Sequence, residues 1–309
     1  MTAWPELPLA AWEPTYATLH LWTQILGKTR LTLCPLQNHY WNVALYVSTR
    51  GLTTSPMPLH DGLLEIELDV VSHALIARTS DGTIDTFMLE PMTVAEFYCR
   101  YRRLLHSLDA DVHINEHPSE IADRTRFSDD TSHAAYDSDA AHRCWRILVE
   151  SDRVLNAYRS EFLGKSSPVH FWWGAFDLAC TRFSGRRAPL HPGGVPYLAD
   201  RVVREAYSHE CHSVGWWPGG GHGDLREPIV REPAYYAYAY PEPKGFSTAR
   251  ISPAEAYYHP TMFEWILPYE VVRTAKDPDA VLRAFCDSTY DAAARLASWD
   301  RRACERQAA

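Results

Sequence analysis

The feature that most constrains the fold is an order of motifs that occurs twice in the chain. In each half a Leu-Gly-Lys triplet ends a helical pattern, and a predicted strand then carries Trp, seven residues and Thr-Arg. The tryptophan and arginine are Trp41 and Arg50 in the first half and Trp173 and Arg182 in the second. This shared order predicts an internal duplication. Chance is the alternative, because Leu-Gly-Lys is a common helix end.

Hydrophobic periodicity predicts the same kind of unit in both halves. An early helix is expected to end at Gly27, and a capping box at Thr93 begins the last helix of the first half. We expect strands at 30–33, 40–48, 63–71, 74–79 and 84–89, and later at 206–214 and 235–240. Further helices are expected at 94–108, 138–162 and 281–299. The chain is therefore predicted to be α+β, with two similar helix–antiparallel sheet–helix units.

The predicted domain boundaries follow from these units. Residues 1–115 form the first unit, the polar segment 116–137 is a connector, and 138–309 form the second unit. The second unit is about 55 residues longer, with inserted loops at about 187–260 that hold Gly/Pro turns, histidines and tyrosines. Long insertions on a compact scaffold are often functional, so we place the site there. Periodicity leaves open whether the halves form separate domains or one continuous sheet.

Composition disfavours several kinds of partner. A net charge of −9 opposes binding to nucleic acid or to a membrane surface, since both need a basic patch. The chain has no run of about 18 apolar residues, and its start lacks the pattern of a signal peptide. Seven scattered cysteines without a CxxC motif are typical of reduced thiols. We therefore expect a cytoplasmic protein with a small-molecule ligand.

The segment 167–221 gathers reactive polar groups, large aromatic side chains and flexible turns, which is the composition of a lined pocket. The candidate catalytic residues are His170, Asp177, His209 and Glu210. Histidine titrates near neutral pH and suits proton transfer, while a carboxylate would orient a histidine or bind a metal. An enzyme would need at least two of these four side chains within hydrogen-bond reach.

The predicted strand around His209 also suggests a metal site. On a strand, Glu210 and His212 share one face while His209 and Cys211 share the other, so this is not the helical HExxH zinc motif. The candidate ligands are His209, His212 and His170, and a site of two histidines and a carboxylate would suit iron or zinc. The alternative is that these side chains hydrogen-bond the backbone or a tyrosine.

Three arginines and two tryptophans are candidate substrate-binding residues. Arg50, Arg182 and Arg186 would clamp a carboxylate or phosphate, since guanidinium binds these groups in a bidentate way. Structural salt bridges are the alternative for the arginines. Trp173 and Trp216 would form walls of the pocket, and burial in the core is the alternative for both.

Six short motifs resemble a known family. They are Trp-Pro-Glu-Leu-Pro at 4–8, Gly-Leu-Thr-Thr-Ser-Pro at 51–56, and the segments 167–174, 182–189, 207–210 and 217–220. Through these motifs the chain resembles, over nearly its whole length, an uncharacterised bacterial family catalogued as a domain of unknown function. The resemblance implies a stand-alone soluble bacterial protein, and it brings no activity, cofactor or catalytic residue.

These patterns together predict an enzyme that acts on a small, anionic organic molecule in an aromatic-lined pocket of histidines and arginines, with or without a metal ion. A non-catalytic binding module with the same lining is one alternative. An interaction protein whose exposed aromatic side chains form a homo-oligomer interface is another. The three differ in whether reactive side chains converge in a concave site.

Overall fold

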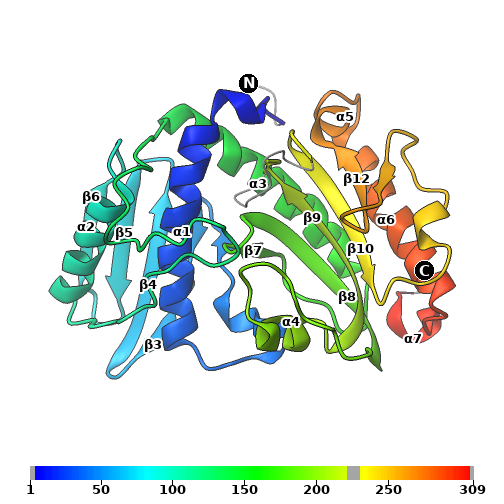
Figure 1. Cartoon of the computed structure of the whole chain (residues 1–309), viewed down its shortest axis with the longest axis horizontal. Coiled ribbons are helices and arrows are strands. Elements are labelled where there is room, and N and C mark those ends of the chain that lie inside the picture. Colours follow the sequence, from blue (N-terminus) through cyan, green and yellow to red (C-terminus); the bar gives the residue numbers. More distant parts are fainter. Residues whose placement is uncertain (1–3, 221–229, 307–309) are drawn as a thin grey trace.

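Two antiparallel sheets of six strands each, with helices packed on them, make the chain α+β, which confirms the predicted fold class. The computed structural model describes residues 4–220 and 230–306, so His222 of the predicted insertion lies outside the described part. Figure 1 shows the first sheet on the left, the second sheet on the right, and α1 (Glu13–Leu33) between them. Among the described helices, none is long and apolar enough to cross a membrane.

The first half contributes α1, one sheet and α2 (Val94–Ser107). Its strands pair in the order β1-β2-β4-β5-β6, and β3 pairs with β4. They are β1 (Tyr46–Val47), β2 (Gly51–Thr53), β3 (Met57–Leu59), β4 (Gly62–Asp69), β5 (Ala74–Thr79) and β6 (Ile84–Met88). The hairpin of β4 and β5 lies where the alternation predicts it. The Thr93 side chain accepts a hydrogen bond from the Glu96 backbone N–H (3.1 Å), which confirms the predicted helix start.

The second half begins with α3 (Ser138–Ser160) and ends with α6 (Pro278–Leu296) and α7 (Arg301–Cys304). Its strands pair in the order β11-β12-β10-β9-β8-β7. They are β7 (His170–Trp172), β8 (Asp177–Arg187), β9 (His209–Trp217), β10 (Ala234–Tyr240), β11 (Tyr257–His259) and β12 (Glu264–Pro268). The shorter elements are α4 (Asp200–Ala206), α5 (Tyr269–Arg273), η1 (Leu9–Ala11), η2 (Asn38–Val43) and η3 (Phe246–Thr248). Both halves therefore run helix, antiparallel sheet, helix, and their common origin stays a prediction.

Helix α1 is longer than predicted, because Gly27 does not end it. Residues 30–33, which were expected to form a strand, belong to its last turns. A Cβ atom at Gly27 would overlap the indole ring of Trp173, so the glycine makes room for that ring. The Trp173 indole N–H donates to the Val43 carbonyl (2.8 Å), which holds the ring against α1.

Replacing Gly27 by alanine tests this account. In an unobstructed helix the change would stabilise the protein by about 1 kcal/mol. Here the added methyl group would displace the Trp173 ring, and we expect the free energy of unfolding to fall by about 1–3 kcal/mol, the usual cost of overpacking. Denaturant unfolding of the variant measures this difference. A variant as stable as the parent would show that the ring moves aside without cost.

The repeated Trp-to-Arg spacing does not mark equivalent positions. Trp41 lies in the 3-10 segment η2 rather than on a strand, and the strand expected there reduces to the short β1. Arg50 precedes β2, whereas Arg182 lies inside β8. The cause is local, since His39 and Tyr40 have φ angles of 57° and 58° in the left-handed region, which interrupts extended backbone.

The two sheets meet at one edge. Leu45, just before β1, exchanges two backbone hydrogen bonds with Phe171 of β7 (3.0 and 2.8 Å). Apolar side chains of both halves form one continuous core, and α1 is buried along most of its length. The polar groups of such a helix need partners inside the protein. Gln24 shows this, since its side chain exchanges two hydrogen bonds with the Ser119 backbone (both 2.8 Å).

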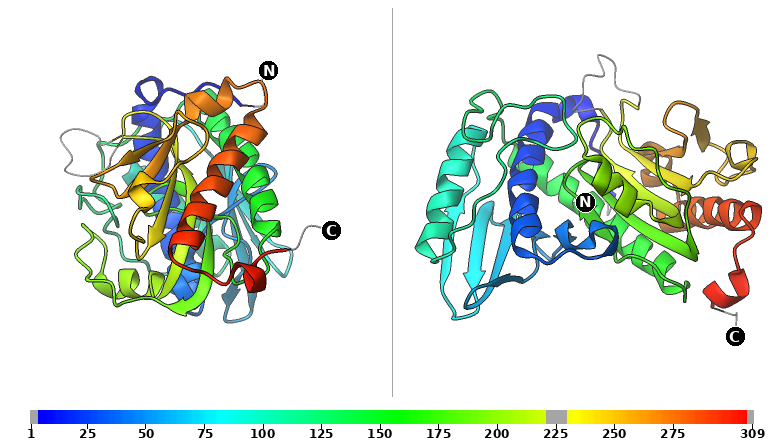
Figure 2. Two further views of the ribbon diagram at one scale, coloured as in Figure 1. Left: turned by 90° about the vertical axis from the view of Figure 1, so that its right-hand side faces the viewer. Right: turned by 60° about the horizontal axis from the view of Figure 1, so that its bottom comes forward.

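The second sheet has two different faces. Helices α3 and α6 run side by side over one of them, which we call the helix face (Figure 2). The opposite face, which we call the front face, carries Asp177 and Thr181 of β8, Ser213 of β9, and Tyr236 and Tyr238 of β10. In Figure 1 α3 and α6 lie behind the strands. Strand alternation therefore decides which polar residues are enclosed by helices and which are not.

Candidate functional site

Three predicted site residues lie on the helix face, inside the core. Arg182 is 3% exposed, its guanidinium lies 3.4 Å from the centre of the Tyr158 ring, and it donates to the Tyr158 carbonyl. His212 is fully buried, and its pKa is lowered to about 3 by burial and by the Arg182 charge. Trp216 is fully buried as well. The geometry therefore favours the structural alternative for all three.

The other two candidate arginines are held in ion pairs. Arg50 Nε lies 2.5 Å from a carboxylate oxygen of Asp69. Arg186 pairs with Glu210 (2.7 Å) and also donates to the Ala297 carbonyl at the end of α6 (2.6 Å). Both arginines thus have the partners that the salt-bridge alternative requires, and Glu210 is the partner of one of them.

His170 and His209 do not contact each other. Packed rings lie between them in the order His170, Trp41, His39, His209, with neighbouring centroids 5.9, 5.4 and 5.6 Å apart. His170 is fully buried, and burial lowers its pKa to about 3. Trp173 is also buried, beneath α1. The structure therefore does not bring the two predicted catalytic histidines together as an acid–base pair.

The predicted metal ligands are also apart. His212 contacts Tyr158 on the helix face, whereas His209 packs against His39 on the other side of the sheet. Within residues 4–220 and 230–306, no three His, Cys, Asp or Glu side chains are grouped so that they could hold a metal ion. The set of His209, His212 and His170 is therefore not assembled, and the alternation of β9 is part of the reason.

The front face brings together a different group, which includes the remaining candidate, Asp177. Tyr236 of β10 donates a hydrogen bond to the Asp177 carboxylate at the start of β8. Its phenol crosses β9 above Gly215, where a Cβ atom would lie 2.5 Å from the Tyr236 hydroxyl oxygen. The three residues lie on adjacent strands, so the register of the sheet creates this contact.

Two further carboxyl groups, Glu120 and Glu264, lie near enough to Asp177 to feel its charge, and we call the three the carboxyl cluster. Burial first, and then the Asp177 charge, raise the pKa of Glu120 to about 7 and that of Glu264 to about 8. Burial also raises the pKa of Asp177 to about 7, although the Tyr236 hydrogen bond opposes this rise. Carboxyl groups with such pKa values exchange protons near neutral pH.

The carboxyl cluster has no cationic partner among the described residues. Glu120 and Glu264 are half-buried, so they keep contact with solvent. Glu120 has a φ of 61°, in the left-handed region, and its backbone N–H donates to the Tyr197 carbonyl (3.1 Å). Strained backbone of this kind is concentrated at functional sites. The cluster is therefore the best candidate site on the front face.

Tyrosines extend the front face beside the carboxyl cluster. The rings of Tyr236 and Tyr238 are stacked with centroids 6.2 Å apart, and Tyr207 packs on Tyr238 at 6.0 Å. The neighbouring strands carry small polar side chains, with the Thr181 and Ser213 hydroxyl oxygens 2.9 Å apart. Acidic groups and aromatic rings thus lie side by side, a combination that attracts cations.

Sequence reasoning identified Asp177 and missed its partners. The alternation of the strand at 235–240 predicts that Tyr236 and Tyr238 share a face, but it does not show which residues lie opposite them. Glu120 lies in the predicted connector and Glu264 at the start of β12, and neither belongs to a motif. No signal in the sequence marks these glutamates, because their position depends on a loop path and on strand pairing.

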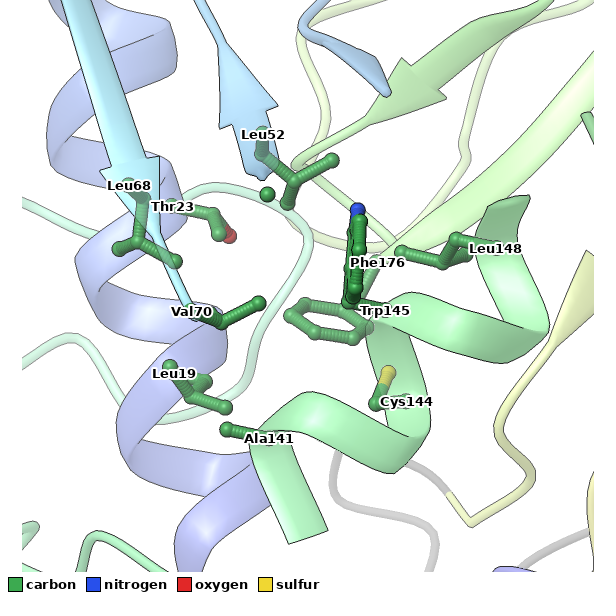
Figure 3. A pocket seen from close by; sticks show the side chains of 11 residues that line it. Leu19, Thr23, Leu52, Leu68, Val70, Ala141, Cys144, Trp145, Leu148 and Phe176 are labelled. Carbon is green, nitrogen blue, oxygen red and sulfur yellow. The ribbon is translucent and has the colours of Figure 1, made fainter. Parts of the chain in front are cut away.

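A cavity in the core does not provide an alternative ligand site. It lies between α1, the first sheet, α3 and the turn after β7, and Figure 3 shows Trp145 and Phe176 among its mainly apolar lining. Its volume is about 20 Å³. Pockets for small molecules usually measure roughly 300–1,000 Å³. We interpret this cavity as an imperfection of core packing.

Comparison with known proteins gives a family but no activity. The family model described as "Family of unknown function (DUF5996)" matches residues 4–306, which confirms the resemblance drawn from the motifs. No curated protein and no solved structure matches the chain. The bacterial origin that the resemblance implies stays a prediction.

Proposed function

Because the chain belongs to that family of unknown function, we propose its activity from the front face alone. The protein is an enzyme that binds a small organic molecule carrying a basic group and exchanges a proton with it at Asp177. The observation that carries this proposal is the carboxyl cluster, three acidic side chains with raised pKa values and no cationic partner among the described residues.

The charge of the cluster defines the ligand. Ionised carboxylates that lie partly out of water need a compensating cation, and an ammonium group would supply it. The rings of Tyr236, Tyr238 and Tyr207 beside the cluster would add cation–π attraction. The ligand proposed here is thus cationic rather than the anionic molecule expected from the arginines, because Arg50 and Arg186 have acidic partners and Arg182 lies in the core.

The chemistry follows from the position of Asp177. Its pKa near 7 lets it accept and return a proton near neutral pH, which is the requirement for a general base. Tyr236 holds the carboxylate in one orientation through its hydrogen bond, so the free oxygen lone pairs keep a fixed direction. Glu120 and Glu264 take up protons in the same pH range and adjust the charge of the site.

Calorimetric binding of primary amines, compared with neutral alcohols and carboxylates of the same carbon skeleton, tests the proposal. We expect amines alone to bind, and more tightly at pH 8.5 than at pH 6, because the carboxyl groups ionise in between while an alkylamine stays charged. The Asp177→Asn variant should bind at least about tenfold more weakly, a loss of about 1.4 kcal/mol.

The control is Glu255→Gln, which removes one negative charge from an exposed position. It should leave amine binding unchanged. Preferential binding of carboxylates, or equal amine binding by Asp177→Asn and the parent, would refute the proposal. Amine binding without conversion of any bound amine in product analysis would instead leave a non-catalytic binding module.

A further inference from the structure

A second group of reactive side chains lies where η2, α4 and the start of β9 meet. It consists of Lys165, His39, His209 and Glu205. Lys165 Nζ lies 2.5 Å from His39 Nε2, the only direct contact between a lysine and a histidine among the described residues. Phe183, which packs on this group, is six residues from Asp177 on β8, so the group is separate from the carboxyl cluster.

The hydrogen bonds of His39 decide where its protons lie. His39 Nδ1 is 2.9 Å from the Ala206 carbonyl oxygen, which can only accept, so Nδ1 carries a proton. The contact between Nε2 and the Lys165 nitrogen then contains one shared proton. Either an ammonium group donates to neutral imidazole, or an imidazolium donates to a neutral amine. In the second state Lys165 is a free amine and therefore a nucleophile.

The charge state of Lys165 is set by opposing contacts. Its Nζ lies over the rings of Phe183 (4.9 Å) and Trp41 (5.4 Å), which attract an ammonium group, but none of the ion pairs between described residues includes it. The Glu205 carboxylate instead accepts the His39 backbone N–H (3.1 Å). Burial lowers the pKa of Lys165 and so favours the neutral amine, although the Glu205 charge opposes this, and burial also lowers the pKa of His39. The side chain is only half-buried, so a small reagent can reach it.

The backbone that places His39 is strained. His39 and the next residue, Tyr40, both have left-handed φ angles, which cost on the order of 1 kcal/mol each for residues other than glycine. The contacts of His39 with Lys165, Glu205 and the Ala206 carbonyl hold this conformation. This backbone conformation fixes the His39 ring beside the Lys165 nitrogen.

We propose that Lys165 is a nucleophilic lysine that forms a Schiff base with aldehydes or ketones, with His39 as its proton acceptor. The ammonium group gives a proton to His39 Nε2, and the free amine attacks the carbonyl carbon, so that a C–N bond forms. The carbonyl oxygen leaves as water after it receives the proton held by His39 and the second amine proton. The third amine proton stays on nitrogen, so the products are a protonated imine and one water, and no oxidant or reductant is consumed.

The chain contains its own reference lysines. It has four lysines, and Lys244 and Lys276 are exposed. Lys28 is buried and donates to the Ser119 hydroxyl (3.0 Å). The exposed pair thus reports the reactivity of an ordinary lysine in the same sample, while Lys28 reports that of an enclosed one.

The experiment treats the full-length protein with limiting benzaldehyde and cyanoborohydride at pH 7, and peptide mass spectrometry measures the benzylated fraction of each lysine. We expect Lys165 to be labelled several-fold more than Lys244 and Lys276, since a lowered pKa leaves a larger fraction of the side chain as free amine at pH 7. Labelling of Lys165 at or below the level of the exposed pair would overturn the proposal.

Two variants separate nucleophilicity from mere exposure. His39→Gln should reduce Lys165 labelling to the level of Lys244 and Lys276, whose labelling should not change. His60→Gln, which replaces an exposed imidazole between β3 and β4, should keep the Lys165 labelling of the parent. Equal Lys165 labelling in folded His39→Gln protein and in the parent would exclude His39 as the proton acceptor.

The pH profile supplies a readout that does not depend on the His39 variant. The titratable groups that face Lys165 and His39 are Glu205 of α4 and His209 of β9, and Arg187 of β8 acts on His209. With these in place, the labelling advantage of Lys165 over Lys244 should shrink as pH rises from 7 to 10, because the exposed lysines then also become free amines. A ratio that stays constant would contradict a selectively deprotonated Lys165.

Discussion

Replacing Trp216 by alanine is expected to lower the free energy of unfolding by about 3–5 kcal/mol, the range found for large-to-small changes of buried tryptophan. Trp216 is fully buried on the helix face, between Leu178 of β8 and Tyr235 of β10, which are its partners in the sheet register. Removal of the indole leaves a cavity that three paired strands and two helices cannot close. Denaturant unfolding followed by circular dichroism measures the loss.

Two matched variants show whether this loss comes from the core. The indole Nε1 of Trp216 is buried and has no hydrogen-bond partner among the described residues, so Trp216→Phe removes an unsatisfied donor and should cost much less than Trp216→Ala. Trp172→Ala removes a half-buried indole from β7 and should also cost less. If Trp216→Ala were as stable as the parent, Trp216 would be a pocket wall, as one interpretation of the sequence suggests.

The free energy of unfolding should fall by on the order of 2 kcal/mol between pH 6.5 and pH 8, because of the carboxyl cluster. The folded-state pKa values of Asp177, Glu120 and Glu264, about 7, 7 and 8, lie above those of the unfolded chain. The folded protein therefore binds more protons than the unfolded chain in this window, and stability decreases as pH rises. Partial exposure of the two glutamates reduces the effect below the full shift.

The lower limit of this pH window is set by the buried histidines. The pKa values of His20, His170 and His212 are lowered to about 4, 3 and 3, mainly by burial. Such histidines make the free energy of unfolding rise with pH up to about 6.5, the pKa of histidine in the unfolded chain. Below that pH this rise hides the opposite effect of the carboxyl cluster. Lys28 sets the upper limit of the window. Burial lowers its pKa to about 8, so above that pH this lysine makes the free energy of unfolding rise with pH.

Thermal or denaturant unfolding at pH 6.5, 7.2 and 8.0 measures the slope. Glu264→Gln is the matched variant, because it removes the group with the highest pKa of the three and keeps its shape. It should gain stability relative to the parent at pH 8 and differ little at pH 6.5, so its slope should be smaller. A parent protein with the same stability at pH 6.5 and 8 would show that the three carboxyl groups do not hold protons in the folded state.

The elements whose signals are local can be predicted from the amino-acid sequence alone. Periodicity and caps gave the hairpin of β4 and β5, the helices α2, α3 and α6, and the strands β9 and β10. The alternation of β9 correctly separated His209 from Glu210 and His212, because side chains of a strand point to opposite faces wherever the strand lies in the protein. The α+β class follows from these elements alone.

The contacts of each polar residue depend on how distant segments of the chain pack together. The sequence predicts that Gly27 ends a helix, but this glycine makes room for Trp173, which is far away in sequence. The sequence predicts that Arg182 binds a ligand, but its side chain lies in the core. This prediction fails because nothing in the sequence shows which face of the second sheet the helices cover. Asp177 was identified, yet its partner Tyr236 comes from two strands away, since a hydrogen bond between side chains depends on the register of all the strands between them.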